Sequence, residues 1–171
     1  MQNVSMLACH ELMGFMNPDL ASDILGFAFE NDRELYQATL AAVAEAKRVR
    51  PVYLQKKPKP ERHRAMLQIL TRSSMEMAAG NLVRGWLLKK HNPMLADFLD
   101  TLEIPHKDGV VDDLPATMDE EKIRMAIDAL LSKYPHETVA VYLHAFNRMN
   151  DEEWSSLSRL LNSDARLQLG A

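Results

Sequence analysis

The sequence has one cysteine, few glycines and no long run of apolar residues. Because Cys9 is alone, an intramolecular disulfide is excluded, and its helical apolar spacing predicts a small core residue in a reducing compartment. The N-terminus shows no signal-peptide pattern, and no run of about 18 apolar residues could form a membrane span. We therefore expect a cytoplasmic protein that does not insert into membranes.

The shortage of glycine also limits the chemistry that the chain can perform. We find no Gly-rich phosphate loop, no GxSxG elbow, no HExxH and no CxxC, and six glycines leave little backbone for cradling phosphates. No cofactor is expected. Whether the protein is an enzyme stays open at this level, and the balance is against it.

The composition that is present favours helices. Hydrophobic residues make up 47% and charged residues 26%, with many Leu, Ala, Met, Glu and Lys, which lose little rotamer freedom in a helix. We predict an all-α fold, a compact bundle of eight to nine helices in a single domain over residues 1–171. A helical-hairpin repeat is the alternative, because Leu87–Pro93 resembles Leu130–Pro135 at a spacing of 42–44 residues.

Several helix starts can be placed from local signals. Asn17-Pro18 and Asn92-Pro93 combine an N-cap residue with proline at the first helical position. Thr117 with Glu120 forms a capping-box pattern, and Asp151 is expected to cap the last helix. The first helix is expected from Val4 onward, and a bend or break is expected near Gly80.

One linker divides the predicted domain. Pro51, Pro58 and Pro60 are incompatible with one continuous helix, and the lysines among them repel one another. We therefore predict subassemblies over 1–49 and 61–164, joined by a basic Pro-rich linker at 50–60.

Charge is strongly zoned along the chain. Residues 1–46 carry net −6, residues 47–91 net +10 and residues 92–171 net −8, which sums to the overall −4. The predicted basic surface draws on the middle zone: Lys56, Lys57, Lys59, Arg62, Arg64, Arg84, Lys89 and Lys90. Such a zone either meets a polyanion or is neutralised by acidic parts of the protein or of a second copy.

Neutralisation by the protein itself, within the chain or across a homodimer, is the interpretation we favour. It predicts a non-catalytic interaction or scaffold protein that self-associates. The alternative is a nucleic-acid-associated protein that uses residues 47–64 on phosphates and Tyr53, His63 or Trp86 on bases, although a pI near 5.9 argues against a dedicated binder. An anionic membrane surface is disfavoured because no helix with exposed bulky apolar residues adjoins the basic segment.

Two further candidates are weaker. Asp97, Asp100, His106 and Asp108 could hold a hard divalent cation, which with His144 would centre a small-ligand or metal-binding enzyme. A solvated helix face and a turn are the stronger explanation of these residues. The eleven methionines, Met13, Met16, Met75 and Met77 among them, are consistent with an adaptable groove for a peptide or apolar ligand.

Overall fold

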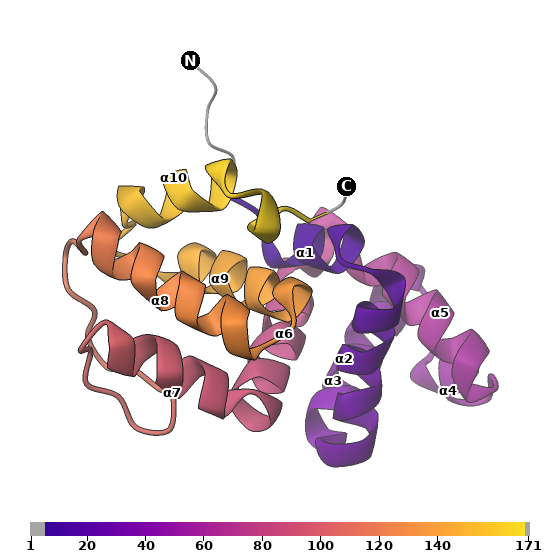
Figure 1. The fold of residues 1–171 in the computed structure, drawn as a ribbon. Coiled ribbons are helices and arrows are strands. Elements are labelled where there is room, and N and C mark those ends of the chain that lie inside the picture. Colours follow the sequence, from indigo (N-terminus) through magenta and orange to yellow (C-terminus); the bar gives the residue numbers. More distant parts are fainter. Residues whose placement is uncertain (1–5, 170–171) are drawn as a thin grey trace. The chain divides into compact units, whose positions relative to one another are not determined.

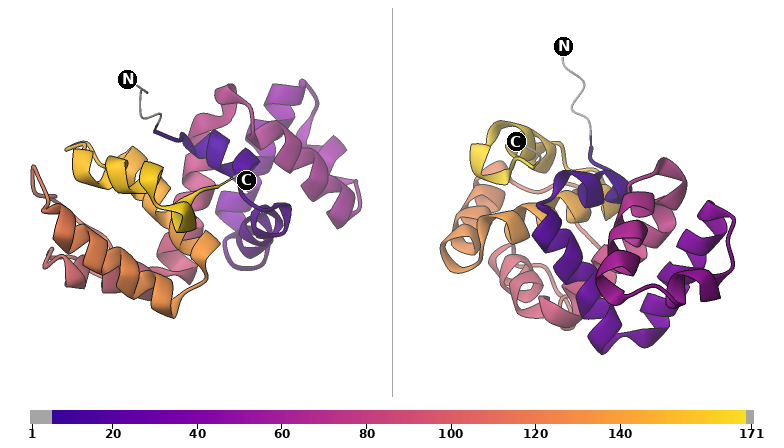
Figure 2. Two further views of the ribbon diagram at one scale, coloured as in Figure 1. Left: turned by 45° about the horizontal axis from the view of Figure 1, so that its top comes forward. Right: turned by 90° about the vertical axis from the view of Figure 1, so that its right-hand side faces the viewer.

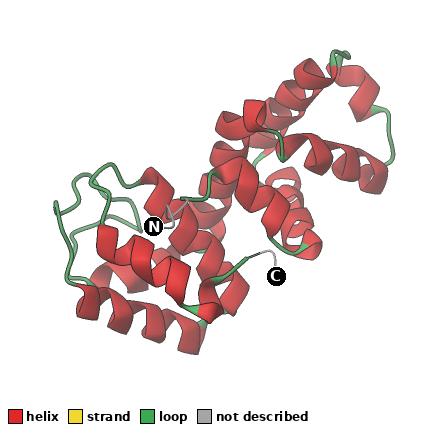
Figure 3. Ribbon diagram, turned by 90° about the horizontal axis from the view of Figure 1, so that it is seen from above, coloured by secondary structure: helices red, strands yellow, loops and turns green. Residues whose placement is uncertain are grey.

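The structure is a computed structural model that describes residues 6–169, and within them it contains helices and no strand (Figures 1 and 3). This confirms the predicted all-α fold, with ten α-helices where eight or nine were expected. The α-helices are α1 (Cys9–Phe15), α2 (Pro18–Asn31), α3 (Arg33–Lys47), α4 (Pro51–Gln55), α5 (Lys59–Leu70), α6 (Glu76–Lys90), α7 (Asn92–Thr101), α8 (Glu120–Lys133), α9 (His136–Met149) and α10 (Ser155–Ser163). Two 3₁₀ turns, η1 (Ser73–Met75) and η2 (Ala165–Leu167), complete the description.

The described helices form two compact units, residues 8–86 and residues 87–169. The boundary between them falls inside α6, whereas the sequence placed the division at 50–60. Both helices that flank 50–60, α3 and α5, belong to the first unit and pack against each other.

In the first unit, α2, α3 and α5 pack side by side (Figures 1 and 2). The buried side of α2 consists of Ala21, Ile24, Leu25 and Ala28, at the spacing of one helical face. Asn17 caps this helix as predicted, because its side-chain oxygen accepts a hydrogen bond from the Asp19 N–H at 2.8 Å.

The first helix begins later than its apolar pattern predicted. Val4 lies outside the described residues, and α1 starts at Cys9. Its start is fixed by Glu76, whose carboxylate accepts the N–H groups of Cys9 at 2.7 Å and His10 at 3.2 Å. The start of α1 therefore depends on a residue far along the chain.

The predicted linker is mostly helical. Pro51 occupies the start of α4, where its missing N–H costs nothing, and the fully buried Leu54 holds this short helix against the unit. Pro60 lies in the first turn of α5 in the same way. The three prolines thus start two helices instead of forming an extended segment.

Gly80 does not break α6. A Cβ at this position would lie 3.7 Å from the Cys9 Sγ atom, an ordinary contact distance, so α1 lies next to α6 here without requiring a glycine. The interruption occurs earlier, where α5 ends at Leu70 and η1 leads into α6.

In the second unit, α7, α8, α9 and α10 surround an apolar core that includes an aromatic cluster. Phe98 packs edge to face on Tyr142 and Phe146, and Phe146 packs on Trp154, with ring centroids 5.5–5.6 Å apart. Two predicted caps were wrong. Asp119, which accepts from the Lys122 N–H, caps α8 in place of Thr117, and Trp154 precedes α10 in place of Asp151.

The connection between α7 and α8 is the longest loop of the described chain (Figure 3). Trp154 Nε1 donates to the Pro115 carbonyl at 2.7 Å, and the Ser156 hydroxyl donates to the Met118 carbonyl at 3.0 Å. Near its start, Gly109 has φ +87°, and the backbone of Lys107 pairs with that of Val110. The loop is therefore held at both ends.

Within residues 6–169, none of the helices combines the length and the apolar character that crossing a bilayer requires.

Candidate interaction surface

The structure gathers part of the predicted basic surface at one end of the first unit. Lys56 and Lys57 follow α4, while Lys59, Arg62 and Arg64 lie on the first two turns of α5. Arg84 is exposed on α6 of the same unit, and Lys89 and Lys90 belong to the second unit. The eight residues therefore do not form one surface of one unit.

Two arginines that were not in the predicted set belong to the same end. Arg48 and Arg50 are exposed between α3 and α4. Arg48 ends α3 in the left-handed conformation, with φ 59° and ψ 42°, where glycine is usually preferred. We define the cationic corner as the exposed or half-exposed cations of this segment other than Arg62, which donates to the Tyr36 hydroxyl: Arg48, Arg50, Lys56, Lys57, Lys59 and Arg64.

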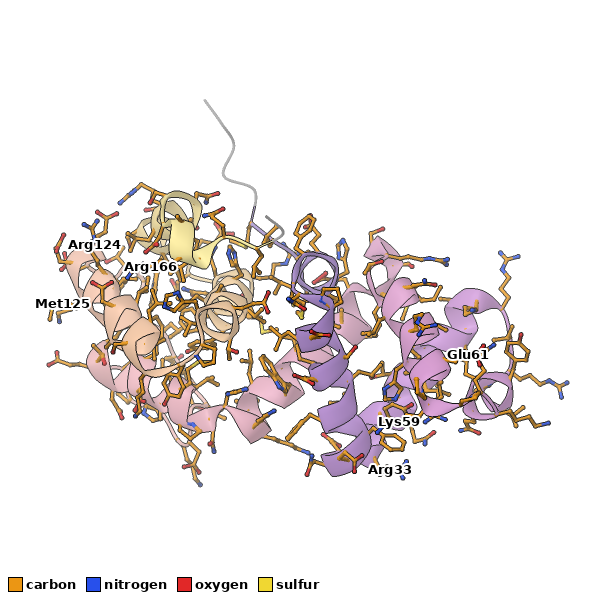
Figure 4. All side chains as sticks on the ribbon, turned by 45° about the vertical axis from the view of Figure 1, so that its right-hand side comes forward. Arg33, Lys59, Glu61, Arg124, Met125 and Arg166 are labelled. Carbon is orange, nitrogen blue, oxygen red and sulfur yellow. The ribbon has the colours of Figure 1, made fainter. Side chains whose placement is uncertain are left out.

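The cationic corner is almost free of ion pairs. Lys59 Nζ lies 3.4 Å from Glu30 Oε1, and no other member of the corner has a carboxylate within 4.0 Å among the described residues. Glu61 is the only acidic residue between positions 46 and 75, and it is exposed (Figure 4). Within residues 6–169, five of the six cations of the corner thus have no ion pair with a carboxylate of the chain.

Instead of carboxylates, an aromatic ring gathers cations beside the corner. The centroid of the Phe29 ring lies 4.5 Å from Arg33 Cζ, 4.6 Å from Lys59 Nζ and 5.5 Å from Arg62 Cζ. Figure 4 labels Arg33 and Lys59 on this part of the molecule. Cation–π contacts hold these side chains while leaving their positive charge uncancelled. This cluster around Phe29 could not be predicted from the sequence, because its members come from three helices.

Beneath the ring, Tyr36, Arg62 and His63 form a hydrogen-bonded chain. Arg62 Nε donates to the Tyr36 hydroxyl oxygen at 2.7 Å, and the hydroxyl lies 3.0 Å from His63 Nε2. Burial, together with the positive charges of Arg62 and Lys59, lowers the pKa of His63 to about 4. His63 is therefore neutral near pH 7, and Tyr36 donates its proton to Nε2.

Only one of the three predicted stacking residues is available. His63 and Trp86 are buried, which leaves neither ring open to a base. Tyr53 on α4 is 52% exposed, and Lys57 Nζ lies 5.0 Å from its ring centroid.

A groove runs along α5 beside the cationic corner. We call it the α5 groove; its volume is about 820 Å³. Met13, Met16, Ala21 and Leu67 provide apolar lining, Lys59, His63 and Arg64 lie toward the N-terminal end of α5, and no carboxylate contributes to it. The rest of the lining is small or neutral.

A second groove of about 440 Å³ lies between α3 and the start of α6. Ala38, Ala42 and Ala78 line it together with Met75 and Met77, and Glu45 is at its rim. The methionines singled out in the sequence thus divide between two grooves, with Met13 and Met16 in the α5 groove. Only the α5 groove combines apolar lining with cations.

The metal candidates are used in other ways. Asp97 accepts hydrogen bonds from the Tyr134 hydroxyl at 2.6 Å and from Lys133 at 2.9 Å, and these bonds lower its pKa. Asp100 pairs with His106 Nε2 at 2.7 Å, while His106 Nδ1 accepts the Gly109 N–H. Residues 6–169 contain no group of three or more acidic, His or Cys residues arranged to hold a metal ion. The remaining candidate, Asp108, lies in the turn with φ 52°.

His144 also has a structural partner. Its Nε2 lies 3.0 Å from the Leu167 carbonyl oxygen, which ties α9 to η2, and burial lowers its pKa. This environment gives no evidence for acid–base chemistry at His144.

Carboxylates gather on the loop between α7 and α8. Asp108, Asp112 and Asp113 are exposed and have no cation within 4.0 Å among the described residues. Val110 between them is 47% exposed. We call residues 108–114 the acidic loop. The second unit therefore carries carboxylates without ion pairs on its acidic loop, and the first unit carries cations without ion pairs in its cationic corner.

The fold and this surface define an all-α protein with opposite, unpaired charges on its two units. No known protein family matches the chain, and neither a curated protein nor a solved structure is detectably similar to it.

Proposed function

We propose that the protein is a non-catalytic interaction protein that self-associates in the cytoplasm, with the cationic corner of one copy binding the acidic loop of another. The observation that carries the proposal is the absence of ion pairs across the corner: among its six cations, only Lys59 has a carboxylate partner within the described residues. The acidic loop has the matching property. Opposite charges that remain unpaired within each unit favour association between copies.

Each copy carries one corner and one loop, so a two-fold dimer would contain the same contact twice. Exposed ion pairs contribute about 0.2–1 kcal/mol each, and several acting together are needed for stable association. Such a contact weakens as salt is added, because both partners are exposed to solvent and screened.

Analytical ultracentrifugation at increasing salt tests the proposal. We expect dimers at about 50 mM salt and a shift toward monomers at several hundred millimolar. A chain that is monomeric at every salt concentration and at high protein concentration contradicts it.

Charge reversal provides the matched comparison. We expect Lys56→Glu with Lys57→Glu to weaken association at least about tenfold, since attraction becomes repulsion at two positions. Arg72→Glu with Arg148→Glu reverses the same number of exposed cations away from the corner and is expected to have little effect. An equal loss of association in the two double variants would assign the effect to the net charge of the chain instead of to the corner.

Mixing variants tests whether the corner and the loop are partners. The Lys56→Glu, Lys57→Glu variant keeps its loop, and an Asp112→Lys, Asp113→Lys variant keeps its corner. Each alone is expected to be monomeric, whereas the mixture is expected to form mixed dimers, because one contact is unchanged and the other is restored with its charges reversed. No recovery in the mixture contradicts this pairing.

A second candidate function, binding of single-stranded nucleic acid, is favoured by one observation. Tyr53 is exposed on α4 beneath Lys57, which provides a stacking surface next to phosphate-binding cations. Fluorescence anisotropy with random-sequence oligonucleotides at 50 and 200 mM salt tests it. Binding that falls steeply with salt and is lost in Tyr53→Ala supports it, and no binding at 50 mM salt excludes it.

A further inference from the structure

We infer that the α5 groove is the receptor for the acidic loop of a second copy, with Val110 on the apolar lining and Asp112 and Asp113 against Lys59 and Arg64. The inference deepens the proposed function and rests on it: it names the segment that docks and the place where it docks. Neither partner has been assigned such a role by similarity to another protein.

The groove has the dimensions and the polarity for one short segment. Its α5 lining runs from Lys59 to Thr71, about three turns or 18 Å at 1.5 Å per residue. An extended segment of five or six residues spans that distance at about 3.3 Å per residue. Its cations lie toward one end of the groove, the N-terminus of α5, where the helix dipole adds further positive potential.

The lining of the groove selects an anionic segment that also carries an apolar residue. No carboxylate lines the groove, and Lys59 pairs with Glu30 outside the lining, so a neutral apolar segment would leave Arg64 beside it without an opposite charge. Conversely, a purely phosphate-bearing strand would leave the half-exposed Leu67 without an apolar partner in the groove. Met13 and Met16 are buried at 4% and 3% exposure and form the floor beneath it.

The acidic loop has the complementary sequence and is already ordered. Val110, Asp112 and Asp113 are exposed, and they lie between the His106–Gly109 hydrogen bond and the Trp154–Pro115 hydrogen bond. A loop held at both ends loses little conformational entropy when it docks. Gly109 contributes to this order, because its φ of +87° is a conformation that other residues rarely adopt.

Charge complementarity is the reason for choosing a second copy as the occupant. In the acidic loop, exposed carboxylates without ion pairs flank Val110, which is 47% exposed. The groove beside α3, in contrast, has Glu45 at its rim and no cation, so it would repel the same loop. The two grooves therefore provide an internal control.

Filling each groove provides the first arm of the test. Ser22 lines the α5 groove and Ser74 lines the groove beside α3, and both are exposed. We expect Ser22→Trp to weaken self-association at least tenfold and Ser74→Trp to leave it within twofold. Because neither serine is buried, both variants should fold, which circular dichroism checks.

Cross-linking provides the second arm. Ser22→Cys on one copy and Asp113→Cys on another are mixed under oxidising conditions, with Ser22→Cys and Met125→Cys as the control mixture. Met125 is 66% exposed on α8, and the native Cys9 is buried and does not compete. We expect the mixed disulfide to form at least tenfold faster with Asp113→Cys than with Met125→Cys.

The outcomes separate this inference from the proposed function. Salt-sensitive dimers in which Ser22→Trp behaves like Ser74→Trp, and in which both cysteine pairs cross-link equally, overturn the groove assignment and leave the proposed function standing. A monomer under all conditions overturns both.

Discussion

Glu76 binds the start of α1 across 66 residues of sequence: its carboxylate lies 2.6 Å from His10 Nδ1 and accepts the His10 N–H at 3.2 Å. With the bond from the Cys9 N–H, one side chain satisfies two of the otherwise unpaired N–H groups at this helix end. Burial alone would raise the pKa of Glu76, but the hydrogen bonds from His10 and Cys9 outweigh it and lower the pKa.

Neutralising this carboxylate should destabilise the first unit. We expect Glu76→Gln to lower the free energy of unfolding by about 1 kcal/mol, because a charged acceptor at a helix start is replaced by a neutral one. Urea denaturation measures this change. The control is Glu45→Gln at an exposed position of α3, whose free energy of unfolding is expected within about 0.5 kcal/mol of that of the unchanged protein. Equal losses in the two variants would show that the α1 contact contributes nothing specific.

The Glu76 carboxylate should also make the free energy of unfolding depend on pH in the acidic range. Because the pKa of Glu76 is lower in the folded protein than its ordinary 4.5, its stabilisation is present above about pH 4.5 and is lost as the pH falls through the lower folded value. The Glu76→Gln variant should therefore lose less stability than the unchanged protein below pH 4.5. Parallel curves for the two proteins would contradict this.

His63 should act in a different pH window. Its pKa falls from 6.5 to about 4 on folding, so the unfolded chain binds the proton more readily between these values. Stability should consequently decrease as the pH is lowered from about 6.5 to about 4, by roughly 1 kcal/mol per pH unit at most. Thermal unfolding from pH 7 to 4 should show this decrease. The decrease should be smaller in His63→Phe, a substitution that cannot titrate; an unchanged slope in that variant assigns the effect to other groups.

Two glycines should respond in opposite ways to the same substitution. A Cβ on Gly26 in α2 meets nothing within 4 Å, so Gly26→Ala should stabilise by about 0.5–1 kcal/mol through helix propensity. A Cβ on Gly109 would lie 2.9 Å from Leu95 Cβ in a backbone with φ +87°, so Gly109→Ala should destabilise by about 1–3 kcal/mol. Chemical denaturation of both variants checks the pair, and the same sign in both would refute the loop geometry.

Some features that depend on neighbouring residues were predictable from the sequence, such as the Asn17 cap of α2, although the caps expected at Thr117 and Asp151 were wrong. The pairing of Asp100 with His106 also lies within one helix end and its loop. Features that depend on distant residues were not predictable. The start of α1 needs Glu76, and Asp97 faces Tyr134 of the next helix instead of a metal.

The basic segment at 47–64 has features of both kinds, some predictable from the sequence and some not. Its charge was evident from composition, but its helical structure was not, because the burial of Leu54 that holds α4 in place comes from tertiary packing. Likewise Phe29 gave no sign that three cations would gather around its ring. The α5 groove could be anticipated only as a property of methionines, since helices α1, α2 and α5 must meet to form it.

At Arg48, the thermal stability of the fold and the strength of self-association are expected to respond in opposite ways to one substitution. The left-handed backbone of this residue costs about 1 kcal/mol for any residue with a Cβ, and glycine would remove that cost. Glycine at this position would therefore favour the fold, whereas the arginine adds one cation to the corner. Arg48→Gly should therefore give a protein that melts at a higher temperature yet associates more weakly, with differential scanning calorimetry and ultracentrifugation moving in opposite directions.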